Sequence, residues 1–296
     1  MVKKVVAALA AGMVMLLLSG CGDARYFALD NPTADAIEVK VDGTLYVIPA
    51  KSEIRIGLQP GSHRLISEAV GEVEFHVYPT KDAGGIINPT LSIYIKVDEV
   101  YRPRAGGAMQ RPPVSRIEVN GVSFEGSFTR YDSFYILPDW TYGVHENFPG
   151  YVASATAGPV VSKVFSCDDF IAYYEQKYNV SGYYENNLKR PEAIDIRASL
   201  PPEIPEFDHP EIQAATQALR NLAHDYISTI EPQEQQRLLD MWYEASYQLA
   251  QYDAKNGHRL TEDERRQLSE FRTAIRQVRS MPLLLIRVIK PAGDMA

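Results

Sequence analysis

The chain has 296 residues and a formal net charge of −8, with 30 lysine and arginine residues against 38 aspartates and glutamates. This acidic balance argues against a nucleic-acid-binding protein and against a polybasic site for anionic membrane surfaces. The length suits one large domain or two smaller ones. Beyond residue 20 no apolar run reaches the length of about 18 residues that a membrane-spanning helix needs, so we expect none there.

Residues 1–22 have the layout of a bacterial export signal. Lys3 and Lys4 precede an apolar run over residues 5–18, which is too short to span a bilayer permanently. The run ends in Leu18-Ser19-Gly20-Cys21, and this tetrapeptide resembles the lipobox of bacterial lipoproteins.

The lipobox resemblance implies a lipid anchor at Cys21. Residues 1–20 would be the cleaved signal peptide, with diacylglycerol on the Cys21 thiol and an acyl chain such as palmitate on the new amino group. Three acyl chains hold a protein at a membrane essentially permanently, since two already suffice. The resemblance, with Gly22 in place of an aspartate, implies the outer membrane, facing the periplasm. The alternative is an ordinary secretory peptide in which a cysteine follows the cleavage site.

Residues 26–128 alternate apolar and polar side chains in short segments, which is the period of strands with one solvent-facing side. Asp42-Gly43 and Asn120-Gly121 are dipeptides that favour two-residue hairpin turns. The strongest alternating segments are residues 37–41, 45–48, 54–56, 73–78 and 91–97. Short strands at this spacing predict a β-sandwich or a small barrel.

Two turns and two repeated segments add to this β pattern. Val41-Asp42-Gly43 and Pro60-Gly61-Ser62-His63 are similar to the turns of PEGA-type surface modules, and the resemblance implies a non-catalytic extracytoplasmic β-sandwich. Asn31-Pro32-Thr33 recurs as Asn88-Pro89-Thr90, and residues 37–43 have a counterpart in residues 117–121. A duplicated β-unit would produce both echoes, and so would chance similarity between strand-and-turn segments.

Candidate contact residues lie in two further segments. Arg102 and Arg104 belong to a loop rich in glycine and proline over residues 102–113, which is either solvated or a contact for an anionic partner. Residues 131–151 are dense in aromatic side chains, among them Trp140 and Tyr142. Such rings suit stacking on sugars or on proline-rich peptides, and they equally suit a seam between domains.

Catalytic chemistry has one candidate, His145-Glu146 in the aromatic segment, as an acid–base pair. The sequence lacks the spacing motifs of metal sites, phosphate-binding loops and nucleophile elbows, so we expect no metal ion and no cofactor. Cys167 is the single thiol left after lipidation. It is a buried apolar residue, half of an intermolecular disulfide, or a nucleophile.

From residue 166 onward the apolar residues follow a helical period. Three pairs have the spacing of a capping box and each precedes an apolar stripe: Ser166 with Asp169, Asp208 with Glu211, and Thr261 with Glu264. Pro232 opens a further helix that ends at Asn256-Gly257, and Leu200–Pro205 predicts an extended linker. Residues 283–289 form either a strand that returns to the β part or a last buried helical turn.

These patterns predict an α+β protein with an N-terminal β-sandwich-like region and a C-terminal antiparallel helical region. The expected domains are residues 21–165, with the aromatic loop region, and residues 166–296. The first functional hypothesis is a lipid-anchored, non-catalytic periplasmic accessory or structural protein that binds a protein partner or an envelope component. The alternative is an enzyme acting on cell-wall or other glycan, with the aromatic segment as the sugar platform and Glu146 or Asp139 as acids.

Overall fold

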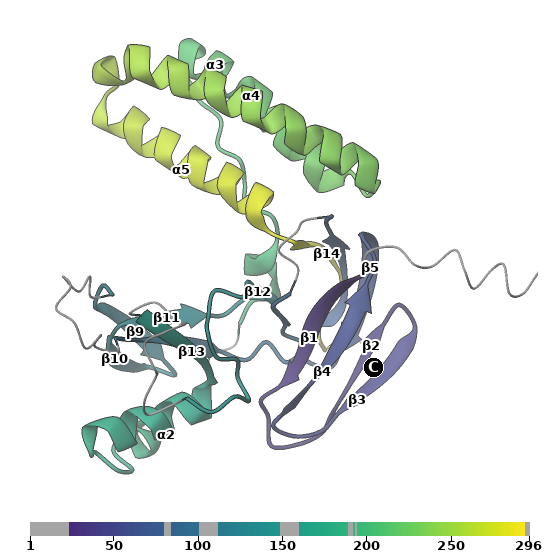
Figure 1. The fold of residues 1–296 in the computed structure, drawn as a ribbon, viewed down its shortest axis with the longest axis vertical. Coiled ribbons are helices and arrows are strands. Elements are labelled where there is room, and N and C mark those ends of the chain that lie inside the picture. The colour runs from purple at the N-terminus through teal and green to yellow at the C-terminus, as the bar shows by residue number, and fades with distance from the viewer. Residues whose placement is uncertain are drawn as a thin grey trace, which may run out of the picture.

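The structure is a computed structural model that describes residues 24–79, 84–100, 112–148, 160–188, 192 and 194–293. β-sheets make up its N-terminal part and helices most of its C-terminal part, so the α+β class is confirmed (Figure 1). Cys21, Arg102 and Arg104 lie outside the described residues. Within the described ranges, no helix has both the length and the apolarity needed to cross a bilayer.

Two sheets in the N-terminal part share one apolar core. A four-stranded sheet has the order β12-β7-β1-β4, and a five-stranded sheet has the order β14-β6-β5-β2-β3. Phe27 and Leu29 of β1 pack in this core with Val39, Leu65 and Phe75 from the other sheet. The strands are β1 (Arg25–Asn31), β2 (Ile37–Val41), β3 (Thr44–Ile48), β4 (Ser52–Leu58), β5 (Gly61–Ser67), β6 (Gly71–Val77), β7 (Ile86–Ile87), β12 (Tyr135–Ile136) and β14 (Leu283–Lys290).

Both predicted hairpin turns are present. Asp42 and Gly43 have φ values of 49° and 83°, and Asn120 and Gly121 have values of 49° and 75°. Positive φ at both central residues is the turn whose twist matches that of the flanking strands. The turns therefore join β2 to β3 and β9 (Ser115–Val119) to β10 (Val122–Gly126).

The two Asn-Pro-Thr segments make equivalent hydrogen bonds. The side-chain amide of Asn31 donates to the carbonyl of Asp35 at 2.8 Å, and that of Asn88 donates to the carbonyl of Ser92 at 2.8 Å. Both asparagines are fully buried and both also donate to a carbonyl from a distant segment, Pro49 or Ser133. The repeated motif therefore has the same structural role twice.

Strand pairing around these asparagines repeats as well. β1 pairs with β4 as β7 pairs with β12, and β2 pairs with β3 and β5 as β8 (Tyr94–Val100) pairs with β11 (Phe128–Tyr131) and β13 (Val160–Ser166). β1 and β7 lie side by side and parallel in one sheet. The shared pattern favours a duplicated β-unit over chance similarity for the two Asn-Pro-Thr segments, with the β9–β10 hairpin as an insertion in the second copy. Residues 117–121 belong to this hairpin, so their similarity to residues 37–43 does not come from the duplication.

Helix α2 (Cys167–Tyr178) packs on the second β-unit. The ring of Phe170 meets that of Phe128 edge-on at 5.1 Å, and Tyr174 meets Phe124 in the same way at 5.1 Å. Ser166 caps the helix by accepting from the Asp169 backbone N–H at 3.3 Å. The Asp169 carboxylate accepts from the Ser166 hydroxyl at 2.6 Å, so the capping box expected at this pair forms only in its first half.

Three long helices follow a linker: α3 (Pro210–Ser228), α4 (Pro232–Asn256) and α5 (Glu262–Ser280). α4 begins at Pro232 as predicted, and the capping box of Thr261 with Glu264 is confirmed. The cap expected from Asp208 is wrong, because Pro210 occupies the first turn and makes His209 the N-cap, without a side-chain hydrogen bond. Short 3₁₀ helices occur at Glu185–Asn187, Ile196–Ser199 and Gly257–Arg259.

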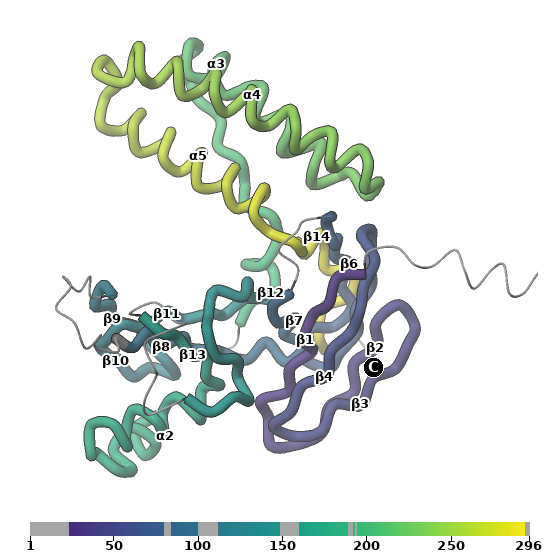
Figure 2. Tube along the Cα trace, in the orientation of Figure 1, coloured from purple at the N-terminus to yellow at the C-terminus, as the bar shows by residue number. Residues whose placement is uncertain are grey.

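The end of the chain returns to the β part. α5 leads directly into β14, which pairs antiparallel with β6 (Figure 2). Of the two forms expected for residues 283–289, the structure therefore shows the strand. The domain division expected at residue 166 stays a prediction, although α2 packs with strands and β14 belongs to a sheet.

Aromatic rings join the sheet to the helices. Tyr78, just after β6, stacks on Tyr226 of α3 with 4.5 Å between ring centroids, and Tyr226 meets Trp242 of α4 edge-on at 5.9 Å. His76 of β6 lies 3.2 Å from the Ile227 carbonyl oxygen. The three long helices and the end of the five-stranded sheet thus share one apolar cluster.

Candidate functional site

A cleft of about 420 Å³ opens where the segment 138–146 crosses the solvent-side face of the four-stranded sheet. We call it the histidine cleft; its walls include Tyr26, Glu53, Gly85, Trp140, His145 and Glu146. Phe27 and Leu29 of β1 point into the shared core, so the alternating residues Ala28 and Asp30 point to the opposite face. The cleft therefore lies between the two β-units, with β1 and β4 beneath it.

Asp30, Glu53 and His145 converge beside this cleft; Glu53 and His145 line it, and Asp30 is buried behind them. Asp30 and Glu53 stand directly opposite each other on β1 and β4. His145 Nε2 donates to Asp30 Oδ1 at 2.5 Å, and the Tyr94 hydroxyl donates to Asp30 Oδ2 at 2.5 Å. Asp30 is 0% exposed, and one ligand-type atom from each of Asp30, Glu53 and His145 lies within 4.8 Å of the others.

Burial and the neighbouring charges shift the pKa values of the groups in this cluster. The hydrogen bond to Asp30 raises the pKa of His145, so the imidazole holds its proton more firmly than a free one. Burial, followed by the charge of Asp30, raises the pKa of Glu53. Burial beside Asp30 also raises the pKa of Tyr94 well above its ordinary value, so its hydroxyl remains a neutral donor. The cluster therefore holds one proton between His145 and Asp30, next to a second carboxyl group, that of Glu53.

The contact residues predicted in the aromatic segment do not all lie at the cleft. Trp140, His145 and Glu146 line the cleft, and the Glu146 carboxylate accepts from the Gly143 N–H at 2.6 Å. Tyr142 is not among the lining residues; its backbone bridges to Lys163. Trp140 also packs beside Ile136 and Val144 between the β-units, which fits the seam as well as the contact interpretation.

Asp139, the second acid of the glycan-hydrolysis hypothesis, interacts with residues outside the cleft. Its carboxylate pairs with Lys96 at 2.7 Å and accepts from the Tyr131 hydroxyl. It does not line the histidine cleft, whereas Glu146 does. The two acids are therefore not brought to one cleft.

Cys167 lies half-buried in the core of the second β-unit. The side-chain amide of Asn120 donates to its sulfur at 3.6 Å. Burial raises the pKa of the thiol to about 11. Because the thiolate is the nucleophilic form, this environment favours the buried apolar residue over the nucleophile.

Asp30, Glu53 and Tyr94 were missed from the sequence. They reach His145 only through strand pairing and a loop crossing, and no local spacing marks such a convergence. One signal was available: an aspartate, Asp30, stands among the otherwise mostly apolar side chains of β1. Buried aspartates are rare unless they are paired, so a charged residue in a buried strand indicates a partner elsewhere in the chain.

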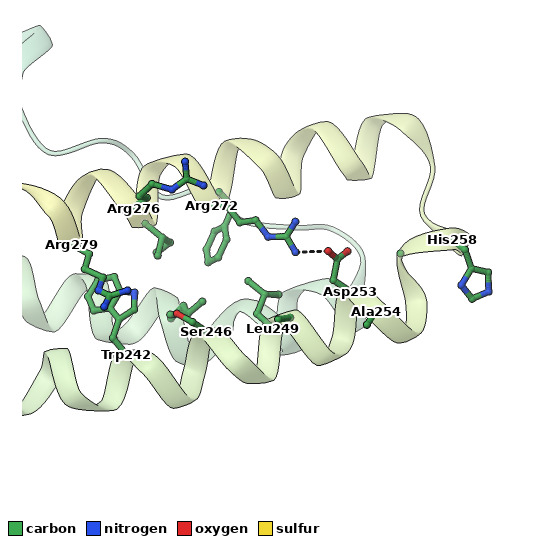
Figure 3. Close-up of a pocket in the computed structure, with 14 residues that line it drawn as sticks. Trp242, Ser246, Leu249, Asp253, Ala254, His258, Arg272, Arg276 and Arg279 are labelled. Atoms are coloured by element: carbon green, nitrogen blue, oxygen red, sulfur yellow. Dashed lines mark hydrogen bonds and ion pairs between the residues drawn. The ribbon is translucent and has the colours of Figure 1, made fainter. Parts of the chain in front are cut away.

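A second hollow, also missed, lies between α4 and α5. We call it the helical groove; it has a volume of about 750 Å³ (Figure 3). Its floor is apolar and includes Trp242, Leu249, Phe271 and Ile275, all buried. The sequence placed an apolar stripe on each helix but did not show which two helices leave a space between them.

Three arginines of α5 follow the rim of this groove at helical spacing: Arg272, Arg276 and Arg279. Arg272 pairs with Asp253 of α4 at 2.8 Å (Figure 3). Arg276 and Arg279 are exposed, and neither has an acidic partner among the described residues. The groove therefore combines an apolar floor with uncompensated positive charge.

Comparison of the chain with protein-family models, with curated proteins and with solved structures found no match.

Proposed function

We propose that the protein is a lipid-anchored, non-catalytic accessory protein of the outer membrane, facing the periplasm, and that it binds a protein partner. In this proposal α3, α4 and α5 form an antiparallel unit, and the helical groove receives an acidic amphipathic helix of the partner. The observation that carries the proposal is the apolar groove floor beneath two arginines that lack acidic partners among the described residues. The anchor rests on Leu18-Ser19-Gly20-Cys21 in the sequence.

A helix suits the shape of the groove. α5 has 19 residues and so extends for about 28 Å at 1.5 Å per residue, which gives an elongated wall rather than a round pocket. Amphipathic helices bind such grooves by placing apolar side chains at positions i, i+3 or i+4, and i+7 on the floor. Ala250 and Ala254 of α4 are the exposed apolar residues of the lining that such side chains would contact, above a floor that includes the buried Trp242 and Phe271.

The exposed arginines on the rim of the groove favour a partner with negative charge. Each exposed ion pair contributes only about 0.2–1 kcal/mol, so the apolar floor would supply most of the affinity. Arg276 and Arg279 would instead orient the bound helix and speed its association, because complementary charges mainly affect specificity and association rate.

Binding is favoured over glycan hydrolysis by the position of the acids. The hydrolase hypothesis needs Glu146 and Asp139 at one cleft, and Asp139 is held by Lys96 and Tyr131 instead. Of the two aromatic residues predicted as contacts, Trp140 lines the cleft and Tyr142 does not.

Photo-crosslinking in cells tests the groove. A photoreactive residue at Ala250, which is exposed and lines the groove, should crosslink the full-length anchored protein to its partner. The matched control is Gln248, which is exposed on the same helix but does not line the groove. The crosslinked peptide should be an acidic amphipathic helix, and the adduct should be lost in the double variant Arg276→Glu, Arg279→Glu but kept in Arg265→Glu.

Three results would contradict the proposal. They are an adduct with a second copy of this chain, an adduct of equal yield after the double charge reversal, or a crosslinked peptide without acidic and apolar faces. The anchor is tested separately, because Cys21→Ala should abolish labelling with radioactive palmitate. Labelling equal to that of the unmodified sequence would remove the lipoprotein part and leave the groove proposal standing.

A further inference from the structure

We propose that Asp30, Glu53 and His145 form a binding site for a divalent transition-metal cation, Zn²⁺ in particular, at the side of the histidine cleft that Glu53 and His145 line. This site uses none of the helical-groove residues and does not depend on the proposed partner.

The starting observation is a like-charge pair in a sheet. Asp30 and Glu53 are directly opposite each other on adjacent antiparallel strands, an arrangement that destabilises a sheet when both residues are ionised. Asp30 is fully buried, and a buried carboxylate needs a paired charge or a metal ion. His145 is the cationic partner of Asp30, and Arg55 adds positive charge near Glu53; a divalent cation would in addition bind both carboxylates directly.

The second β-unit has an uncharged pair where the first has Asp30 and Glu53. When Asn31 is matched with Asn88, the residue equivalent to Asp30 is Ile87. Ile87 pairs with Tyr135 in the register in which Asp30 pairs with Glu53. The matched pair in the second unit, Ile87 and Tyr135, is uncharged and packs in the shared apolar core, whereas Asp30 lies on the opposite face of the sheet, so the acidic pair is specific to the cleft side.

The geometry and ligand types fit Zn²⁺. Imidazole nitrogen and carboxylate oxygen bind Zn²⁺ at about 2.0–2.2 Å, so two ligand atoms on one ion lie at most about 4.4 Å apart. The three ligand atoms lie within 4.8 Å of one another, so binding needs only a small movement of the exposed Glu53 and His145 side chains. Zinc replaces the proton between His145 Nε2 and Asp30 Oδ1, and this proton leaves to solvent when the cation binds.

The site has a residue that orients one of its ligands, and it leaves one coordination position open. Tyr94 holds the second oxygen of Asp30 at 2.5 Å, and hydrogen bonds of this kind orient ligating carboxylates in metal sites. Glu53 and His145 are exposed and face the cleft, so a fourth position remains for water or a ligand group. Water can fill this fourth position, which would complete the tetrahedral coordination that Zn²⁺ prefers.

Calorimetric titration of the chelator-treated, full-length protein with Zn²⁺ tests the site, with Mg²⁺ as the comparison ion. We expect one equivalent of Zn²⁺ to bind, with affinity reduced at least about tenfold in Glu53→Gln and in His145→Gln. Tyr94→Phe should weaken binding about 10–100-fold through loss of orientation. His63→Gln is the matched control, because His63 also pairs with an aspartate, Asp42, at 2.6 Å, but no third ligand group among the described residues completes a cation site there.

The proposal is overturned if no stoichiometric binding occurs at millimolar Zn²⁺. It is equally overturned if Glu53→Gln and His145→Gln bind as tightly as the unmodified sequence, or if His63→Gln alone abolishes binding. Glu53→Gln keeps the size of an exposed side chain, so it remains informative where His145→Gln disturbs folding. A zinc-dependent rise in melting temperature that is lost in Glu53→Gln gives a second readout.

Discussion

The stacked tyrosines that join the sheet to the helices should respond in opposite directions to removal of their hydroxyl groups. Tyr78 and Tyr226 are both 0% exposed. The Tyr78 hydroxyl donates to the Ile227 carbonyl at 3.3 Å, whereas the buried Tyr226 hydroxyl has no hydrogen-bond partner within the described part of the chain. We therefore expect Tyr78→Phe to destabilise the protein slightly and Tyr226→Phe to stabilise it.

The magnitudes follow from what each hydroxyl contacts. A neutral hydrogen bond contributes about 0.5–1.5 kcal/mol, and the Tyr78 bond belongs at the lower end because His76 also reaches the Ile227 carbonyl, at 3.2 Å. Burying a polar group without a partner costs about 1–3 kcal/mol, so Tyr226→Phe should gain about 1 kcal/mol or more. Tyr78→Ala removes the whole ring and should cost about 3–5 kcal/mol.

Urea unfolding of the three variants, followed by circular dichroism and by tryptophan fluorescence, measures these differences. The slope with denaturant should stay constant, so that a change in midpoint reports stability alone. A loss of 1 kcal/mol or more in Tyr226→Phe would refute the reasoning, because it would reveal a partner for that hydroxyl. An unchanged midpoint for Tyr78→Ala would show that the helices are stable without the sheet.

Two further predictions concern a glycine pair and the buried thiol. A Cβ at Gly71 would lie 2.2 Å from the Lys290 carbonyl oxygen at a φ of +77°, whereas at Gly43, with φ +83°, nothing lies within 4 Å. Gly71→Ala should therefore cost about 2–5 kcal/mol and Gly43→Ala only about 1 kcal/mol in urea unfolding, and equal costs would contradict the close approach of β14 to β6. Burial raises the pKa of Cys167 from 9.0 to about 11, so its thiolate fraction at pH 8 falls about a hundredfold and labelling by a thiol reagent should be about that much slower in the folded protein than in urea. The labelling rate should rise about tenfold per pH unit below that pKa, and equal folded and unfolded rates would place the thiol at the surface.

Local signals predicted the elements whose chemistry is local. Alternation placed most of the strands, positive-φ dipeptides placed two hairpins, and Pro232 and Thr261 placed two helix starts. The cap expected at Asp208 failed because a proline two residues later set the start of α3. The histidine cleft could not be found in this way, since Asp30 and His145 are 115 positions apart. The helical groove depends on how far α4 stands from α5, and this distance is set by tertiary packing.

The duplicated β-unit explains how a cluster without a local motif arises. One copy supplies Asp30 and Glu53 from its first strand pair, and the other supplies Tyr94 and the loop that carries His145. Neither copy alone holds the whole set, because the position of Asp30 is Ile87 in the second unit. Both copies keep the buried asparagine that fixes the end of the first strand, while the residue before it is charged in one copy and apolar in the other. The proposed cation site is therefore a property of the junction, and variants that separate the two units should lose cation binding before they lose the turns built on Asn31 and Asn88.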